Sequence, residues 1–141
     1  MKTMFNSFIL MFIIGILPCE ILNGQYLVGK QANEIKTIMN NEYKRFKLNT
    51  TDKNTAFKYL KYENKINEIT ILFFLDENDT CKLVRMMYDY SNINDVLDDL
   101  ENNHTKIDNN NYECLVDDKK VSVELTEDQW FFTLTVRKKK E

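Results

Sequence analysis

The stretch from Ile69 to Tyr90, ITILFFLDENDTCKLVRMMYDY, constrains the fold most strongly, because two long apolar runs flank one short polar turn. This pattern predicts a β-hairpin at the centre of a sheet. Side chains alternate between the two faces of a strand, so the first run divides into two sets. One face receives Ile69, Ile71, Phe73 and Leu75, and the other receives Leu72 and Phe74. Both faces of this strand are therefore apolar, and the rest of the chain must shield them from water.

The N-terminus has the features of a signal peptide. A positive start at Lys2 precedes an apolar run from Phe8 to Leu17, and Pro18 follows. The run is far shorter than the roughly 20 residues of a membrane-spanning helix. We expect a signal peptide over residues 1–24, cleaved after Gly24, and an exported periplasmic or extracellular protein.

A second interpretation of the same segment remains open. Ile16-Leu17-Pro18-Cys19 is a degenerate lipobox, in which Cys19 would become the lipid-anchored first residue of a lipoprotein. Either way, the remainder, residues 25–141, has the length and composition of a single domain: the chain has 141 residues, of which 43% are hydrophobic and 29% charged.

Composition excludes several kinds of site. The net charge of −3 argues against a nucleic-acid partner. Only Gly29 lies beyond the signal peptide, so no glycine-rich phosphate loop or dinucleotide fingerprint can form. His104 is the single histidine, which excludes a histidine-based metal cluster. We therefore expect no cofactor.

Hydrophobic periodicity predicts the remaining elements. Apolar residues at three- and four-residue steps indicate a helix over residues 31–46 and a second helix beginning at Ser91 or Asn92. Besides the hairpin, strands are expected over 57–62, 112–116, 121–125 and 130–136. In the last of these, Trp130 and alternate residues after it should face the core, and Phe131 should face outward. The order predicts an α+β fold of two αβββ units, in which two helices cover one face of a mainly antiparallel six-stranded sheet.

Two blocks of sequence, ITILFFLDENDTCKLVRMMYDYSNINDVLDDLENN and VELTEDQWFFTLTVRKKK, resemble a group of uncharacterised small exported α+β proteins of Bacteroidota. The shared features are an LFFLD-type strand, a strand ending in Asp-Tyr and a WFFT-type last strand. The element order also resembles the αβββ repeat of β-lactamase-inhibitor-protein and outer-membrane-assembly-lipoprotein folds. The resemblance implies a fold, and it carries over no functional residue.

Cys81 and Cys114 remain after removal of the signal peptide. In an oxidising compartment they could form a disulfide, and the alternative is two buried, inert thiols. A catalytic cysteine would need a base, and the only imidazole lies in an asparagine-rich segment. The alternation of Asp76, Asn78 and Thr80 resembles the start of a calcium-binding loop, but the required glycine and glutamate are missing, so a solvated turn is the better interpretation.

Two functional hypotheses follow. The first is an exported, non-catalytic domain that binds a protein or a small apolar ligand through Leu72, Phe74 and Phe131, with a homodimer as one form of that interaction. The second is a small hydrolase or isomerase that uses carboxylates and tyrosines, with Asp89, Tyr88 and Tyr90 as candidates. A pocket with one of these carboxylates buried inside it would favour the second hypothesis.

Overall fold

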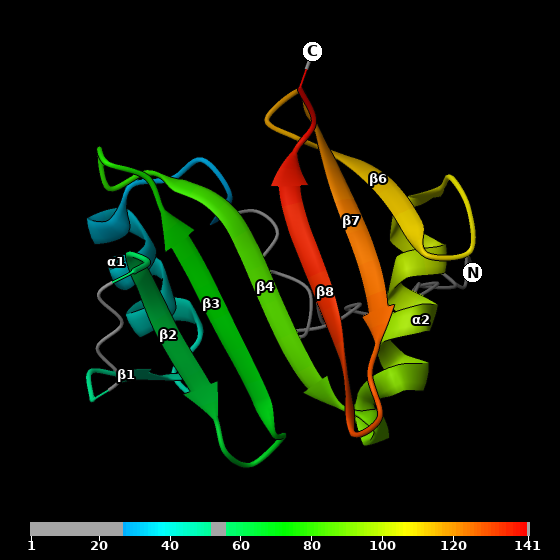
Figure 1. Ribbon diagram of the computed structural model, residues 1–141, viewed down its shortest axis with the longest axis horizontal. Coiled ribbons are helices and arrows are strands. Elements are labelled where there is room, and N and C mark those ends of the chain that lie inside the picture. The colour runs from blue at the N-terminus through cyan, green and yellow to red at the C-terminus, as the bar shows by residue number, and fades with distance from the viewer. Residues whose placement is uncertain (1–26, 52–55, 141) are drawn as a thin grey trace, which may run out of the picture.

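The structure is a computed structural model that describes residues 27–51 and 56–140. It contains two helices and an antiparallel sheet of eight strands (Figure 1). The elements are α1 (Ala32–Glu42), β1 (Lys47–Asn49), β2 (Tyr59–Asn64), β3 (Ile69–Leu75), β4 (Cys81–Asp89), a 3₁₀ turn (Tyr90–Asn92), α2 (Ile93–Asn103), β5 (Thr105–Lys106), β6 (Asn111–Val116), β7 (Lys119–Glu127) and β8 (Phe131–Lys138). The predicted signal peptide and Cys19 lie outside the described residues.

The order of strands across the sheet is β1-β2-β3-β4-β8-β7-β6-β5. β4 and β8 therefore form the central pair, and each helix is followed by four strands that run from one edge to the centre. The α+β class and the antiparallel pairing agree with the sequence prediction, but the count of six strands is wrong. The two additional strands, β1 and β5, have three and two residues, which is too short to produce a readable alternation.

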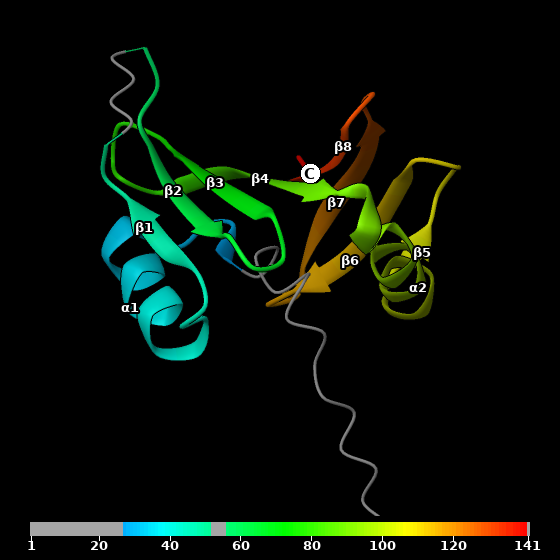
Figure 2. The ribbon, with the colours of Figure 1, turned by 90° about the horizontal axis from the view of Figure 1, so that it is seen from below.

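Both helices lie on the same side of the sheet (Figure 2). Ile35 and Met39 of α1 are fully buried, and so are Val96 and Leu100 of α2. These four-residue spacings place each pair on one stripe of its helix. α1 ends at Glu42, four residues before the predicted end, because the chain must become extended at Lys47 to pair with β2.

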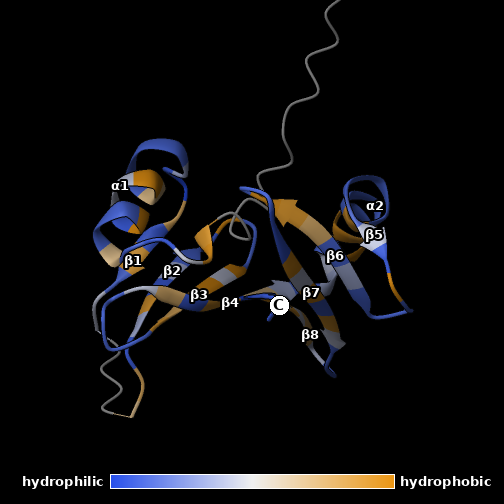
Figure 3. Cartoon of the chain, turned by 90° about the horizontal axis from the view of Figure 1, so that it is seen from above, coloured by the Kyte–Doolittle hydropathy of each residue, from blue (hydrophilic) through white to orange (hydrophobic). Residues whose placement is uncertain are grey.

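One continuous core fills the space between the helices and the sheet. Ile69, Ile71, Phe73 and Leu75 of β3 are all buried in it, as the alternation predicted. The ring of Phe73 packs edge-on against Tyr62 at 5.9 Å between centroids, and Tyr88 stacks on Phe132 at 5.0 Å. Colouring by hydropathy shows the apolar residues distributed along the strands and on both helices (Figure 3).

The start of the last strand differs from the prediction. Trp130 was expected in the core, yet it is 76% exposed. β8 begins one residue later, because Asp128 donates its backbone N–H to the carbonyl of Phe131 and places Trp130 in the connecting turn. Phe132, Leu134 and Val136 are completely buried, as predicted, but Thr133 and Thr135 between them are also buried, with exposed fractions of 9% and 5%.

The segment before α1 attaches that helix to the hairpin. The backbone N–H of Gly29 donates to the carbonyl of Cys81 at 2.7 Å, and Cys81 donates to Lys30 at 2.9 Å. Gly29 has a φ of 87°, and a Cβ there would lie 2.3 Å from Nζ of Lys138. The positive φ therefore favours glycine, whereas the Lys138 amine lies at the end of a flexible side chain that could move aside. Over residues 27–51 and 56–140, neither helix has the length and apolar character needed to cross a bilayer.

Candidate binding groove on the helix-free face

The face of the sheet opposite α1 and α2, called here the helix-free face, carries a set of apolar side chains from three neighbouring strands. The strand register aligns Tyr59 of β2 with Phe74 of β3, and Phe74 with Leu83 of β4. Two residues further along, it aligns Lys61, Leu72 and Arg85. Neighbouring strands lie about 4.8 Å apart, so the side chains in each row contact one another.

These residues form a groove of about 630 Å³. It is lined by Phe57, Tyr59, Lys61, Thr70, Leu72, Phe74, Lys82, Leu83, Arg85 and Met87. This volume is within the range of small-molecule sites in proteins. Leu72, Phe74, Leu83 and Met87 are half-buried, and Phe57 at the rim is 62% exposed. The groove therefore offers an apolar surface that solvent can reach.

Aromatic contacts hold the side chains of the groove in place. The rings of Tyr59 and Phe74 lie 6.0 Å apart between centroids, at an angle of 51°. The guanidinium carbon of Arg85 lies 5.8 Å from the centroid of Phe74, a distance at which a cation interacts favourably with a π system. Phe74 is therefore contacted from β2 on one side and from β4 on the other.

The three cationic side chains that line the groove, Lys61, Lys82 and Arg85, differ in whether an acidic side chain neutralises their charge. Lys61 pairs with Glu63 at 3.0 Å, and the hydrogen bond from Lys61 holds the pKa of Glu63 below its ordinary value. Arg85 and Lys82 make no ion pair with a carboxylate among the described residues. The groove thus contains two cationic groups that have no acidic partner within residues 27–51 and 56–140.

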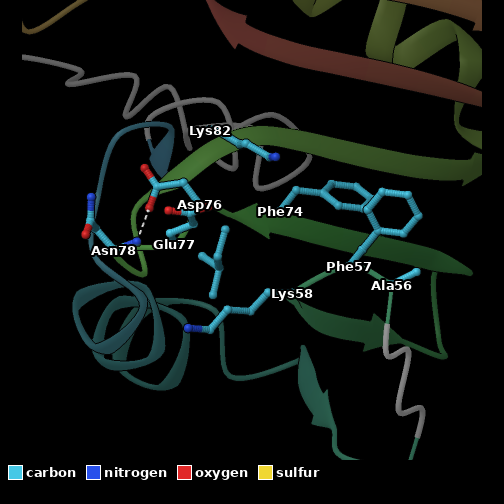
Figure 4. Close-up of a pocket in the computed structure, with 9 residues that line it drawn as sticks. Ala56, Phe57, Lys58, Phe74, Asp76, Glu77, Asn78 and Lys82 are labelled. Carbon is cyan, nitrogen blue, oxygen red and sulfur yellow. Dashed lines mark hydrogen bonds between the residues drawn. The ribbon is translucent and has the colours of Figure 1, made fainter.

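A second depression adjoins the groove at the β3–β4 turn and shares Phe57, Phe74 and Lys82 with it. Figure 4 shows that the amine of Lys82 extends away from the carboxylate of Asp76 and toward the side of the two phenylalanine rings. Asp76 accepts hydrogen bonds from the backbone N–H groups of Asn78 and Thr80, both at 2.9 Å. The DENDT segment is thus organised as a turn by its own aspartate, and the described residues contain no cluster of three or more metal-ligating side chains.

The predicted binding residues are only partly brought together. Leu72 and Phe74 line the groove, whereas Phe131 does not. Phe131 shares the helix-free face but pairs with Asp89, at the opposite end of β4 from Leu83. Six residues along a strand separate the two positions, which corresponds to roughly 20 Å.

Tyr59, Leu83, Arg85 and Met87 are groove residues that the sequence analysis did not identify. β4 carries apolar residues on both of its faces: Val84 and Met86 lie on one, and Leu83 and Met87 on the other. The sequence pattern alone therefore cannot decide which of these two faces packs against the helices. The register also shifts between Phe74 and Leu75, which prevents a simple count across the turn. β1 pairs with Lys61, Tyr62 and Glu63, so this part of β2 does not lie at the edge of the sheet.

Cys81 and Cys114, the two cysteines among the described residues, are free thiols in the structure. Cys81 lies in β4 and Cys114 in β6, and β8 and β7 lie between those strands. Three strand spacings correspond to at least about 14 Å, whereas a disulfide needs Cα atoms within about 7 Å. The two cysteines are therefore too far apart for the disulfide that the sequence analysis considered, and each is a separate thiol. Burial raises the pKa of Cys81 to about 11 and also raises that of Cys114.

The candidate catalytic residues do not converge. Tyr88 is buried on the helix side, where its hydroxyl contacts Sδ of Met86 at 3.4 Å. Asp89 points to the other face and accepts a hydrogen bond from the backbone N–H of Ser91 at 2.9 Å, which lowers the pKa of its carboxyl group. Tyr90 donates its hydroxyl to the backbone carbonyl of Asp128. Each of the three therefore has a structural contact of its own.

A lysine-rich depression lies at the other side of the molecule. It surrounds Leu115 and contains Lys119, Lys120, Lys138, Lys139 and Lys140 together with Asp118. Lys139 pairs with Glu113 of β6. This cluster is a second cationic surface, and unlike the groove its only apolar lining residue is Leu115.

Comparisons of the chain with protein-family models, curated proteins and solved structures find no match.

Proposed function

We propose that this protein is an exported, non-catalytic binding domain, and that the groove on its helix-free face holds an apolar ligand or an apolar segment of a partner protein. The observation that carries the proposal is the groove itself. Phe74, Leu72, Leu83 and Met87 are half-buried side chains from two adjacent strands, on the face that neither helix covers. Apolar area that remains accessible in one contiguous patch usually marks an interaction site.

The test uses a neutral probe, 1-decanol, and methyl NMR spectra of Leu72, Leu83 and Met87. We expect decanol to shift these methyl signals in the wild-type protein. Phe74→Lys places a charge in the groove and should abolish the shifts while the protein stays folded. The matched control is Phe131→Lys, which places the same charge on the same face but roughly 20 Å away, and decanol binding should be retained.

Two outcomes would contradict the proposal. Absence of methyl shifts in the wild-type protein would show that the groove does not accept apolar molecules. If Phe74→Lys unfolds the protein, the helix-free face of β3 is internal core, and the argument for a binding surface is lost.

The export part of the proposal depends on the signal-peptide pattern of residues 1–24. Mass spectrometry of protein from the native host should find Gln25 as the first residue. A diacylated Cys19 would instead support the lipoprotein interpretation.

We also propose that the chain contains two related units and belongs with the small exported Bacteroidota proteins whose strand motifs it resembles. The symmetric sheet order supports the first part, since α1 with β1–β4 and α2 with β5–β8 are arranged alike on either side of the β4–β8 pair. Each proposed unit has one short edge strand before the three longer strands of the predicted αβββ pattern. Separate expression of residues 93–141 would test whether this unit folds independently.

A further inference from the structure

We infer that the ligand of the groove is a small amphipathic anion, with an apolar body against Leu72, Phe74 and Met87 and an acidic head group at Arg85. This inference rests on the proposed function and specifies its ligand. It begins from the position of Arg85, a solvent-exposed side chain on β4 that lines the groove together with the apolar residues. The strand register places Arg85 directly between Leu72 of β3 and Thr135 of β8.

Among the described residues, the positions that surround Arg85 in the sheet carry no negative charge. Its eight nearest positions on the helix-free face follow from the register and are Leu72, Thr135, Leu83, Met87, Phe74, Thr70, Arg137 and Thr133. None of these is a carboxylate, and the one charged residue among them is a further cation, Arg137. Arg137 has its own counter-ion, since it lies 3.9 Å from Glu124. Arg85 is therefore left without an acidic partner inside the described part of the protein.

The guanidinium is also held in position. It lies 5.8 Å from the centroid of the Phe74 ring, which itself contacts Tyr59 at 6.0 Å. A guanidinium presents several N–H donors in a planar fork that matches a carboxylate, sulfonate or phosphate. Arg85 is thus oriented beside apolar side chains while its donors remain available to a ligand.

Charge complementarity selects the head group of the ligand. The chain carries a net charge of −3, yet every charged residue that lines the groove is a cation: Lys61, Lys82 and Arg85. Lys61 is compensated by Glu63, and Lys82 borders the depression that contains Asp76 and Glu77. Arg85 is the cation with the least acidic surroundings, so it is the residue that we assign to the anionic head.

The volume of about 630 Å³ and the closely spaced apolar residues favour a small molecule over a folded partner as the occupant. A second copy of the chain is disfavoured because each copy would bring the same cations to the interface. The occupant that fits these features is one small molecule with one acidic group.

The experiment compares three probes that share one alkyl chain: decanoate, 1-decanol and decylammonium, each below its micellar concentration. Methyl NMR signals of Leu72, Leu83 and Met87 report binding. We expect decanoate to bind about tenfold more tightly than decanol, the factor that one charge-assisted hydrogen bond in an open site supplies. Decylammonium should bind most weakly.

Variants test whether Arg85 is the residue that causes the preference for decanoate over decanol. Arg85→Gln should weaken decanoate binding about tenfold, to the level of decanol, and leave decanol binding unchanged. Arg85→Lys retains the charge without the planar fork and should retain part of the preference. Lys36→Gln, on the opposite side of the molecule in α1, removes the same charge and should have no effect.

Several results would overturn the inference. Equal affinity for decanoate and decanol would remove the anionic head group but leave the proposed function intact, whereas absence of binding by all three probes would remove both. A decanoate preference that survives Arg85→Gln but is lost in Lys120→Gln would move the anion site to the lysine-rich depression. A dimer in sedimentation experiments that Phe74→Lys dissociates would make the groove a self-association surface.

Discussion

The two halves of the sheet have the same order of elements but different helix-free faces. In the N-terminal half (α1 and β1–β4), that face carries Leu72, Phe74, Leu83 and Met87. In the C-terminal half (α2 and β5–β8), strands β7 and β8 present Ser122, Glu124, Thr126, Thr133 and Thr135 over most of the same face. The covered faces, in contrast, are apolar in both halves.

This difference shows which apolar residues the fold needs for stability and which it does not. The C-terminal half demonstrates that a sheet of this kind needs only one apolar face, because its other face is largely hydroxyl-bearing or charged. The apolar residues of the groove are therefore additional to the requirements of folding. An alternating strand with one solvated face is the usual pattern in antiparallel sheets, and β3 departs from it.

The largest effect should come from the covered face of β3. Phe73 is completely buried, and Phe73→Ala should lower the free energy of unfolding by about 3–5 kcal/mol. Phe74→Ala, one residue away on the helix-free face, should cost less than about half as much, because its side chain is only half-buried. Chemical denaturation of both variants measures the difference, and equal losses would show that both faces of β3 are core.

The next comparison concerns the thiols, Cys81 in the N-terminal half and Cys114 in the C-terminal half. Burial raises the pKa of Cys81 from 9.0 to about 11, so its thiolate fraction at pH 8 falls about a hundredfold. Iodoacetamide labelling of the native protein, followed by mass spectrometry, should therefore modify the half-buried Cys114 first.

The same shift makes stability depend on pH. The thiol of Cys81 has a higher pKa in the folded state than in the unfolded state. Its contribution to the free energy of unfolding is therefore present below pH 9.0 and is lost as the pH rises toward about 11. Cys81→Ala should lack this alkaline loss. A cross-linked peptide containing both cysteines would instead demonstrate a disulfide and contradict the separation of β4 and β6.

A smaller effect should come from the hairpin turns. Asp76 accepts two backbone hydrogen bonds in the β3–β4 turn, whereas Asp128 accepts one, from Gln129, in the β7–β8 turn. Asp76→Ala should cost about 1 kcal/mol of unfolding free energy, and Asp128→Ala should cost less. Asp76→Asn keeps the accepting oxygen and serves as the control. Thermal unfolding ranks the three variants, and a loss in Asp76→Asn equal to that in Asp76→Ala would reject the hydrogen-bond explanation.

The last comparison separates the effect of the groove residues on binding from their effect on stability. The double variant Leu72→Thr/Phe74→Thr gives the groove the character of β8, and threonine is well suited to strands. The free energy of unfolding should fall by no more than about 2 kcal/mol, because both side chains are only half-buried, while decanol binding is lost. Retained binding would show that the ligand site does not depend on the groove.

Periodicity within single segments was sufficient to predict much of this protein. The hairpin of β3 and β4, the division of β3 into two faces and the two helices all follow from local alternation or three- and four-residue spacing, which reflect backbone geometry that neighbouring residues share. Leu72 and Phe74 were identified as candidates for the same reason. The α+β class follows from the order of these elements.

Tertiary structure decided the features that depend on distant segments. β1 and β5 are too short to carry a pattern and exist because β2 and β6 offer them hydrogen-bonding edges. The face of Arg85 and Met87 depends on a register shift beside Leu75, and the separation of Phe131 from Phe74 depends on how β8 aligns with β4. The separation of Cys81 and Cys114 depends on strand order. Pairing between strands is set by long-range contacts, so the sequence determined which residues are apolar, and only the folded sheet determined which of them meet.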